Sequence, residues 1–136
     1  MPRPKRLRKI VAPPGFKGYK PYGNQPNNKS HVDLFYEEYE ALKLADYDKM
    51  NHLDASKLMG ISRPTFARIY ESARRKMAKA LVETREIKSV FGNAVLDKSW
   101  YECTACHARF TIPDTIVALA CPLCKNRKIN SLIQAI

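Results

Sequence analysis

Apolar residues recur at spacings of three and four along residues 53–82, a pattern that predicts two amphipathic helices. Gly60 separates them, because glycine adopts a positive φ without steric cost and so permits a tight turn. Ser62 is placed to cap the second helix, and Pro64 falls in its first turn, where a missing N–H does little harm. The apolar stripe of that helix consists of Phe66, Ile69, Tyr70, Ala73, Met77, Ala80 and Leu81. This arrangement is typical of a helix-turn-helix, whose second helix enters the major groove of DNA.

The opposite face of the second helix is basic. Residues 63–79 contain six Lys or Arg residues and a single acid, Glu71. A solvated helix face is the ordinary explanation of such a charge run, but acidic partners at helical spacing are nearly absent here. We therefore predict a DNA-binding face formed by Ser62, Arg63, Thr65, Arg68, Ser72, Arg75 and Lys79. The alternative is a helix pair that only closes over a core.

An earlier apolar pattern, from about residue 36 to residue 47, predicts another helix that packs behind these two. Acidic residues surround it, and we interpret Glu37, Glu38 and Glu40 as a solvated face rather than a catalytic pair. Asp33 is a candidate for its N-terminal cap. We therefore expect residues 31–85 to form a mainly α domain of three helices.

Residues 1–30 carry eight Lys or Arg residues and no acid, together with six Pro and three Gly. This composition predicts a basic, Pro-rich arm with a short strand through residues 7–11, and we expect Arg3, Lys5 and Arg6 to contact DNA. A solubilising tail, or a segment that packs on the following domain, is an alternative interpretation.

The C-terminal stretch contains two CxxC pairs separated by fourteen residues. Two such turns can direct four thiolates at one ion, so Cys103, Cys106, Cys121 and Cys124 are predicted to bind one structural Zn²⁺ per chain. Alternating apolar residues on either side predict short strands, and residues 100–136 therefore indicate a small β zinc ribbon. A redox dithiol and a rubredoxin-type iron site are the alternatives. Residues 86–99 are interpreted as a connector with a hairpin around Gly92 and Asn93.

The composition of the chain limits the partners and the compartment that we expect for it. The 136-residue chain has a net charge of +11, which favours nucleic acid as a partner. No apolar run approaches the ~20 residues of a membrane span, and no secretion signal is visible. Cysteine pairs without a signal suggest a reducing compartment, so we expect a cytoplasmic, nucleoid-associated protein. No nucleophile–base pair, phosphate loop or open metal site is evident, so we expect neither an enzyme nor a small-molecule substrate.

The chain resembles a family of small bacterial and archaeal proteins of unknown function that are described as predicted DNA-binding proteins. The resemblance covers residues 1–85 and rests on PRPKR at 2–6, YKPYG at 19–23, EYEALKLAD at 38–46 and MGISRPTFARIYESARRKMAKAL at 59–81. Residues 24–32 depart from the family pattern. The resemblance implies a helix-turn-helix similar to region 4 of sigma factors and a role in transcription regulation.

The sequence therefore predicts a mainly α helix-turn-helix domain followed by a small β zinc ribbon. The expected function is that of a transcriptional regulator, which binds double-stranded DNA, as a homodimer, with the helix that starts near Arg63. An adaptor that docks on the transcription machinery and an RNA-binding protein are the alternative functions.

Overall fold

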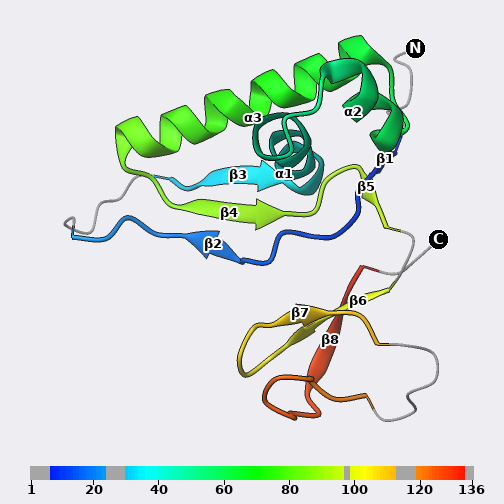
Figure 1. Ribbon diagram of the computed structural model, residues 1–136. Coiled ribbons are helices and arrows are strands. Elements are labelled where there is room, and N and C mark those ends of the chain that lie inside the picture. The colour runs from blue at the N-terminus through cyan, green and yellow to red at the C-terminus, as the bar shows by residue number, and fades with distance from the viewer. Residues whose placement is uncertain (1–6, 24–29, 97–98, 113–118, 134–136) are drawn as a thin grey trace, which may run out of the picture.

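The computed structural model describes residues 7–23, 30–96, 99–112 and 119–133. The helices form one continuous run in this part of the chain, and the strands of three small sheets precede and follow it (Figure 1). The helical elements are α1 (Tyr36–Leu42), which continues into the π-helical turn η1 (Lys43–Tyr47), then α2 (His52–Met59) and α3 (Arg63–Glu83). No helix in these ranges combines the length and the apolar character needed to cross a membrane.

The α2–α3 corner forms as the sequence predicts. Gly60 ends α2 in the left-handed region, with a φ of 68°. Ser62 caps α3, and its side-chain oxygen accepts the backbone N–H of Thr65 at 3.3 Å. Pro64 lies in the first turn of α3. Ser56 of α2 is buried and donates its hydroxyl to the Leu53 carbonyl oxygen, so that α3 can pack closely against α2.

The expected mainly α fold is wrong, because two sheets are built into the helical part of the chain and the fold is a mixture of α and β. Short strands flank the helices: β1 (Arg8–Lys9), β2 (Gly18–Tyr19) and β3 (Val32–Phe35) precede them, and β4 (Ile87–Val90) and β5 (Ala94–Val95) follow them. β1 pairs with β5 in parallel, and β4 lies between β2 and β3. β3 is parallel to β4 and β2 is antiparallel to it.

The expected hairpin around Gly92 and Asn93 is also wrong. β4 and β5 do not pair with each other, because each finds its partner in the N-terminal segment. α3 packs on the sheet through a cluster formed by Val32, Leu34, Ala73, Ala80 and Ile87. The predicted apolar stripe of α3 ends before Leu81, which is three-quarters exposed.

The interpretation of the α1 acids as a solvated face is wrong as well. Glu37, Glu38 and Glu40 are at most 5% exposed, because each faces backbone or side-chain donors of other elements. Asp33 does not cap α1 either, since it belongs to β3, and the N-cap residue is Phe35.

The C-terminal sheet lies apart from the other two (Figure 1). It consists of β7 (Arg109–Phe110), β6 (Trp100–Cys103) and β8 (Ile129–Ile133), in that order and antiparallel. Arg109 joins it to the rest of the molecule, because its guanidinium donates to the Pro14 carbonyl oxygen and lies over the ring of Tyr36.

Candidate functional site

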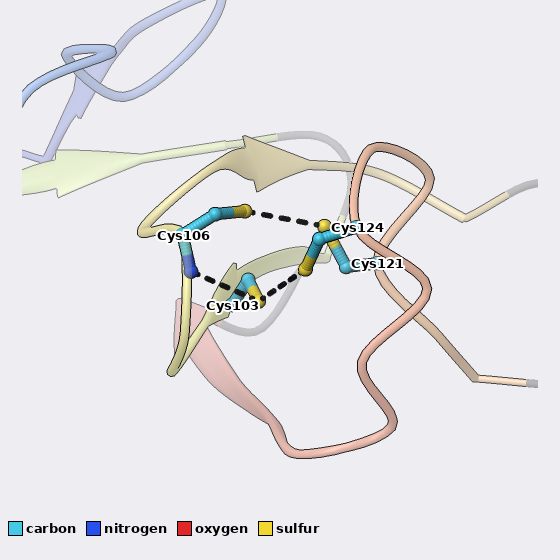
Figure 2. A group of neighbouring side chains, drawn as sticks. All are labelled: Cys103, Cys106, Cys121 and Cys124. Atoms are coloured by element: carbon cyan, nitrogen blue, oxygen red, sulfur yellow. Dashed lines mark hydrogen bonds between the residues drawn. The ribbon is translucent and has the colours of Figure 1, made fainter.

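The four cysteines come together at one end of the C-terminal sheet. Cys103 ends β6, Cys106 and Cys124 lie in turns, and Cys121 directly precedes the second turn (Figure 2). Their sulfur atoms all lie within 4.8 Å of one another, and the pairs Cys103–Cys124 and Cys106–Cys121 are each separated by 3.5 Å. Four sulfurs at about 2.3 Å from one ion in a tetrahedron are about 3.8 Å apart. The cluster therefore has the dimensions of a four-thiolate metal site.

Both CxxC loops have the same backbone path. In each loop the residue after the second cysteine donates its N–H to the carbonyl oxygen of the first cysteine, from His107 to Cys103 and from Lys125 to Cys121. Both His107 and Lys125 are in the left-handed region, with φ values of 61° and 66°. This repeated turn directs two sulfurs from each loop toward a common centre. His107 is not one of the clustered residues.

Backbone amides favour the thiolate form of the buried cysteines. The N–H groups of Cys106 and Ala105 point at the sulfur of Cys103 from 3.5 and 3.4 Å, and lower the pKa of that thiol. The amides of Cys124 and Leu123 likewise lower the pKa of Cys121, to about 6. Because the thiolate is the form that binds metals, this end of the sheet could hold a metal ion with no open coordination position.

The second candidate site is the outer face of α3. Arg63, Arg68, Arg75 and Lys79 are all exposed on it. Arg75 forms an exposed ion pair with Glu71 at 2.7 Å. Within the ranges that the structure describes, the other three make no hydrogen bond or ion pair. The structure therefore exposes four of the predicted residues of α3 to solvent.

The remaining predicted residues of this face form hydrogen bonds within the protein. Ser62 and Thr65 bond to each other, since the Ser62 hydroxyl donates to the Thr65 oxygen at 2.9 Å in addition to capping the helix. Ser72 faces α1 and donates its hydroxyl to Glu38 at 2.6 Å. These side chains hold the helix in place, and their exposed neighbours form the basic surface.

The N-terminal segment reaches the α2–α3 corner. The aliphatic stem of Lys9 lies over Gly60, where an added Cβ would be 3.5 Å from the Lys9 side chain. β1 therefore brings a cationic residue next to the start of α3. The predicted arm residues Arg3, Lys5 and Arg6 lie outside the described residues.

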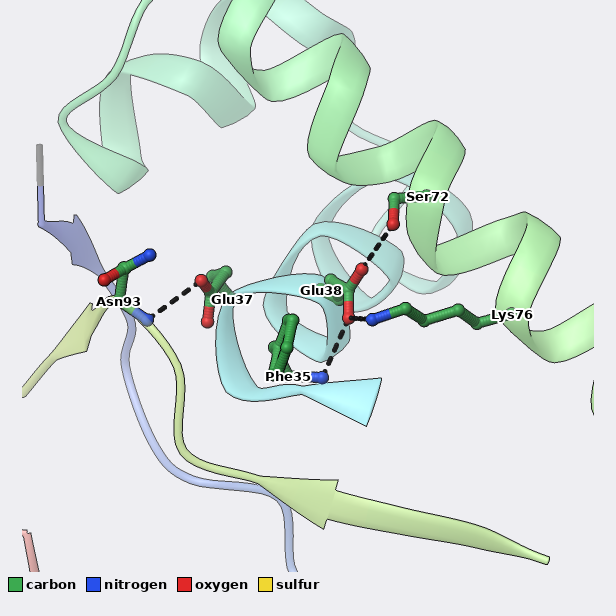
Figure 3. Close-up of polar contacts among 6 residues, drawn as sticks. All are labelled: Phe35, Glu37, Glu38, Ser72, Lys76 and Asn93. Atoms are coloured by element: carbon green, nitrogen blue, oxygen red, sulfur yellow. Dashed lines mark hydrogen bonds and ion pairs between the residues drawn. The ribbon is translucent and has the colours of Figure 1, made fainter. Parts of the chain in front are cut away.

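A polar cluster behind α3 was not anticipated. Glu38 accepts hydrogen bonds from Phe35, Ser72 and Lys76, and Glu37 accepts one from the backbone of Asn93 (Figure 3). An acid three residues after a helix cap is a sequence signal that could have identified the role of Glu38. No local signal connects Glu37 with Asn93, because the two residues belong to distant segments.

Comparison with known proteins gives a consistent set of relatives. A family described as "Protein of unknown function DUF134" matches residues 1–95. A UPF0251 protein of Chloroherpeton thalassium is 36% identical over 132 residues, which cover 97% of this chain and 87% of the relative. A UPF0251 protein of Methanothermobacter thermautotrophicus is 36% identical (96% and 67% covered), and one of Pelotomaculum thermopropionicum is 40% identical (81% and 83% covered). No solved structure matches the chain.

Proposed function

The chain belongs to the DUF134 family of proteins of unknown function, and we propose that it binds double-stranded DNA with α3, as a transcription regulator does, and carries a structural zinc ion. The observation that supports DNA binding most strongly is the exposed basic face of α3. Arg63, Arg68 and Lys79 have no acidic partner in the described ranges, so their charges are available to a polyanion.

The distribution of acids supports the same proposal. The three glutamates of α1 are buried, and each accepts a hydrogen bond from another segment of the chain. The outer face of α3 therefore keeps a positive potential, which Glu71 and Asp46 reduce through their ion pairs with Arg75 and Arg74. Lys9, which lies over Gly60, adds a cation beside the turn that leads into α3.

The position of each cation along α3 predicts its role. The first turns of a recognition helix reach base edges, so we propose that Arg63 and Arg68 read bases. An Arg that bridges O6 and N7 of guanine supplies roughly 1–3 kcal/mol of discrimination. Arg75 and Lys79 lie further along the helix, where we propose that they contact phosphates.

The zinc proposal rests on the donor set. Four sulfurs, each within 4.8 Å of the others, match the tetrahedral thiolate coordination that zinc favours in structural sites. Metal analysis of protein purified without added metal is the test. We expect one zinc per chain, whereas bound iron, or a folded ribbon without metal, would overturn the assignment.

The DNA proposal is tested by salt titration of a fluorescent duplex selected from genomic fragments and of a scrambled duplex. Arg68→Ala should lose the preference for the selected duplex while retaining most of the affinity for the scrambled one. Arg75→Ala should weaken binding to both and reduce the salt slope by about one unit. Lys88→Ala is the matched control, because it removes an exposed charge from β4 rather than from α3.

Three results would contradict this proposal. Absence of binding to either duplex at low salt would exclude DNA as the partner and favour a protein-docking role. Tighter binding to structured RNA than to DNA would favour the RNA alternative. Equal loss of affinity on both duplexes in Arg68→Ala would exclude the base-reading role of that residue.

A further inference from the structure

A cavity of about 650 Å³ lies between the helices and the sheet of β2, β4 and β3. Residues of the sheet, of α1 and η1, and of the C-terminal half of α3 line it (Figure 1). Leu34 and Ile87 of the sheet are buried, at 2% and 6% exposure, whereas Leu81 of α3 is 75% exposed, so the cavity extends from the core to the surface. Its volume is in the range of cavities that hold small molecules. Neither the predicted DNA-binding residues nor the cysteine cluster contributes to the lining.

The cavity interrupts the packing of α1 and α3 on the sheet. Four apolar residues pack against the buried cluster of these elements but are themselves only partly buried, namely Phe16, Tyr39, Leu42 and Met77. All four line the cavity. Protein interiors are normally packed as densely as organic crystals, so apolar side chains beside such a space lack contacts that a ligand can supply. An apolar molecule would therefore complete this part of the core.

Aromatic side chains form a large part of the lining. The rings of Phe16 and Tyr39 meet edge to face, with their centres 5.9 Å apart, and the ring of Tyr19 meets Phe16 in the same way at 4.7 Å. Tyr47 of η1 adds a fourth ring, and this residue is 80% exposed. Aromatic rings gain energy from edge-to-face and offset contacts beyond that of the buried area alone. A flat aromatic ligand therefore gains more here than a saturated ligand of similar size.

The charged groups of the lining already have partners within the protein. Lys43 and Asp46 are the charged residues among those that line the cavity. The Lys43 ammonium donates to Asp48 at 3.2 Å. Asp46 accepts the Tyr70 hydroxyl at 2.5 Å, and its other oxygen lies 3.7 Å from the Arg74 guanidinium. Because this cation and this anion leave the lining without net charge, a charged ligand would lose hydration without gaining a free counter-charge.

One wall of the cavity is an uncommon backbone element. The π-helical turn η1 contributes Lys43, Asp46 and Tyr47 to the lining. Single π-helical turns are rare, and they are frequent at functional sites. The hydroxyl groups of the three lining tyrosines, Tyr19, Tyr39 and Tyr47, form no hydrogen bond within the described part of the chain. These hydroxyls are therefore available to a polar substituent of a ligand.

We propose that this cavity binds an uncharged, flat aromatic molecule of bicyclic size. Its rings pack against the aromatic lining around Phe16 and Tyr39, and its polar substituent bonds to a tyrosine hydroxyl. Binding at this cavity does not depend on the proposed DNA function, because none of the predicted DNA-binding residues lines it.

Calorimetric titration of the full, metal-loaded chain, without DNA, tests the site with three molecules of one bicyclic frame. The compound 2-naphthol is aromatic and uncharged at neutral pH, 2-naphthoate carries a carboxylate, and decahydro-2-naphthol is saturated. We expect saturable one-to-one binding of 2-naphthol and at least about threefold weaker binding of the other two. Absence of 2-naphthol binding would refute the site, and equally tight binding of either other compound would refute the proposed ligand class.

Two variants locate the bound molecule. Tyr19→Ala and Tyr47→Ala each remove one lining ring, and each should weaken 2-naphthol binding by about two- to tenfold, the range that one aromatic contact supplies. Melting temperatures without ligand check the fold, and the exposed Tyr47 keeps the test decisive if loss of the Tyr19 ring destabilises β2. Tyr22→Ala is the matched control, because it removes a fully exposed tyrosine outside the cavity and should bind as the wild type does.

The variants also define the results that contradict this location. Wild-type affinity in both Tyr19→Ala and Tyr47→Ala, or an equal loss in Tyr22→Ala, would place the bound 2-naphthol elsewhere. Sedimentation tests a second copy of the chain as the occupant. A dimer that Tyr47→Ala converts to a monomer, and that binds no 2-naphthol, would assign the cavity to the second copy. Since these experiments contain no DNA, a failure of the DNA proposal would leave their results unchanged.

Discussion

Replacement of Glu38 by alanine tests how α3 is held on α1. The Glu38 carboxylate is 5% exposed and accepts the Lys76 ammonium at 2.7 Å, the Ser72 hydroxyl at 2.6 Å and the Phe35 N–H at 2.9 Å. The ammonium also lies 4.0 Å from the centre of the Phe35 ring. Glu38→Ala therefore removes three hydrogen bonds and leaves the partly buried ammonium of Lys76 without its carboxylate.

The size of the expected loss of unfolding free energy follows from the burial of Glu38 and Lys76. Removal of one member of a buried ion pair costs about 3–5 kcal/mol, and each lost neutral hydrogen bond about 1 kcal/mol. Lys76 keeps 27% of its side chain exposed, so water can hydrate part of the ammonium and the lower end applies to the pair. Adding about 1 kcal/mol for each of the two other donors, we expect Glu38→Ala to lower the free energy of unfolding by about 5 kcal/mol.

Urea denaturation of metal-loaded protein, followed by far-ultraviolet circular dichroism, measures this change. Glu71→Ala is the matched control, because it breaks the exposed Glu71–Arg75 ion pair within α3. For this variant we expect the free energy of unfolding to change by about 0.5 kcal/mol or less. Lys76→Met should restore part of the loss when added to Glu38→Ala, since it removes the unpaired charge. A Glu38→Ala effect as small as the control would refute the argument, as would a double variant less stable than Glu38→Ala alone.

Three further changes have defined outcomes. Gly60→Ala should lower the free energy of unfolding by about 1–2 kcal/mol in the same urea assay, because it places an L-residue at a φ of 68°. An unchanged free energy of unfolding would contradict the role of Gly60 as the left-handed C-cap of α2. Burial raises the pKa of Glu40, so the folded state retains a proton that the unfolded chain loses as pH rises. Melting temperatures across pH should therefore show Glu40→Gln as more stable than wild type at neutral pH, an advantage that disappears below the ordinary carboxyl pKa of 4.5. Metal removal by a chelator should expose residues 100–133 to proteolysis while α1–α3 stay folded, because the buried members of the ribbon cluster are Phe110 and two of the metal-binding cysteines, and its other apolar residues are only partly buried; unchanged protection would refute this.

The sequence by itself determined the features that depend on short-range geometry. A glycine with a positive φ, a serine cap and a proline in the first turn define the α2–α3 corner, and the structure confirms all three. The two CxxC spacings likewise determine two identical turns, and the structure confirms that their four sulfurs gather. Within the corner and within each CxxC loop the interacting groups are only a few residues apart, so the spacing of residue types was sufficient. The contacts between the two loops join residues 15 and 21 positions apart, and the repeated motif predicted them because both loops offer the same thiolate pair.

Only the tertiary structure determined which strands pair and that the glutamates of α1 are buried. Val32 pairs with Ile87, and Arg8 pairs with Ala94, across nearly the whole helical segment. Strands of two to four residues carry little periodicity of their own, and a backbone hydrogen bond does not depend on the identity of its partner's side chain. For this reason the local pattern indicated a mainly α domain where the folded chain is a mixture of α and β.

The glutamates of α1 show that the local sequence also does not determine which charged side chains are buried. Their composition predicted a solvated face, because most carboxylates are exposed. Glu38 is buried because Ser72 and Lys76 of α3 bind it, and Glu37 is buried because the turn at Gly92 leaves room for it. These partners lie 34 to 56 residues away in sequence. Burial of a charge depends on donors that only the folded chain brings together.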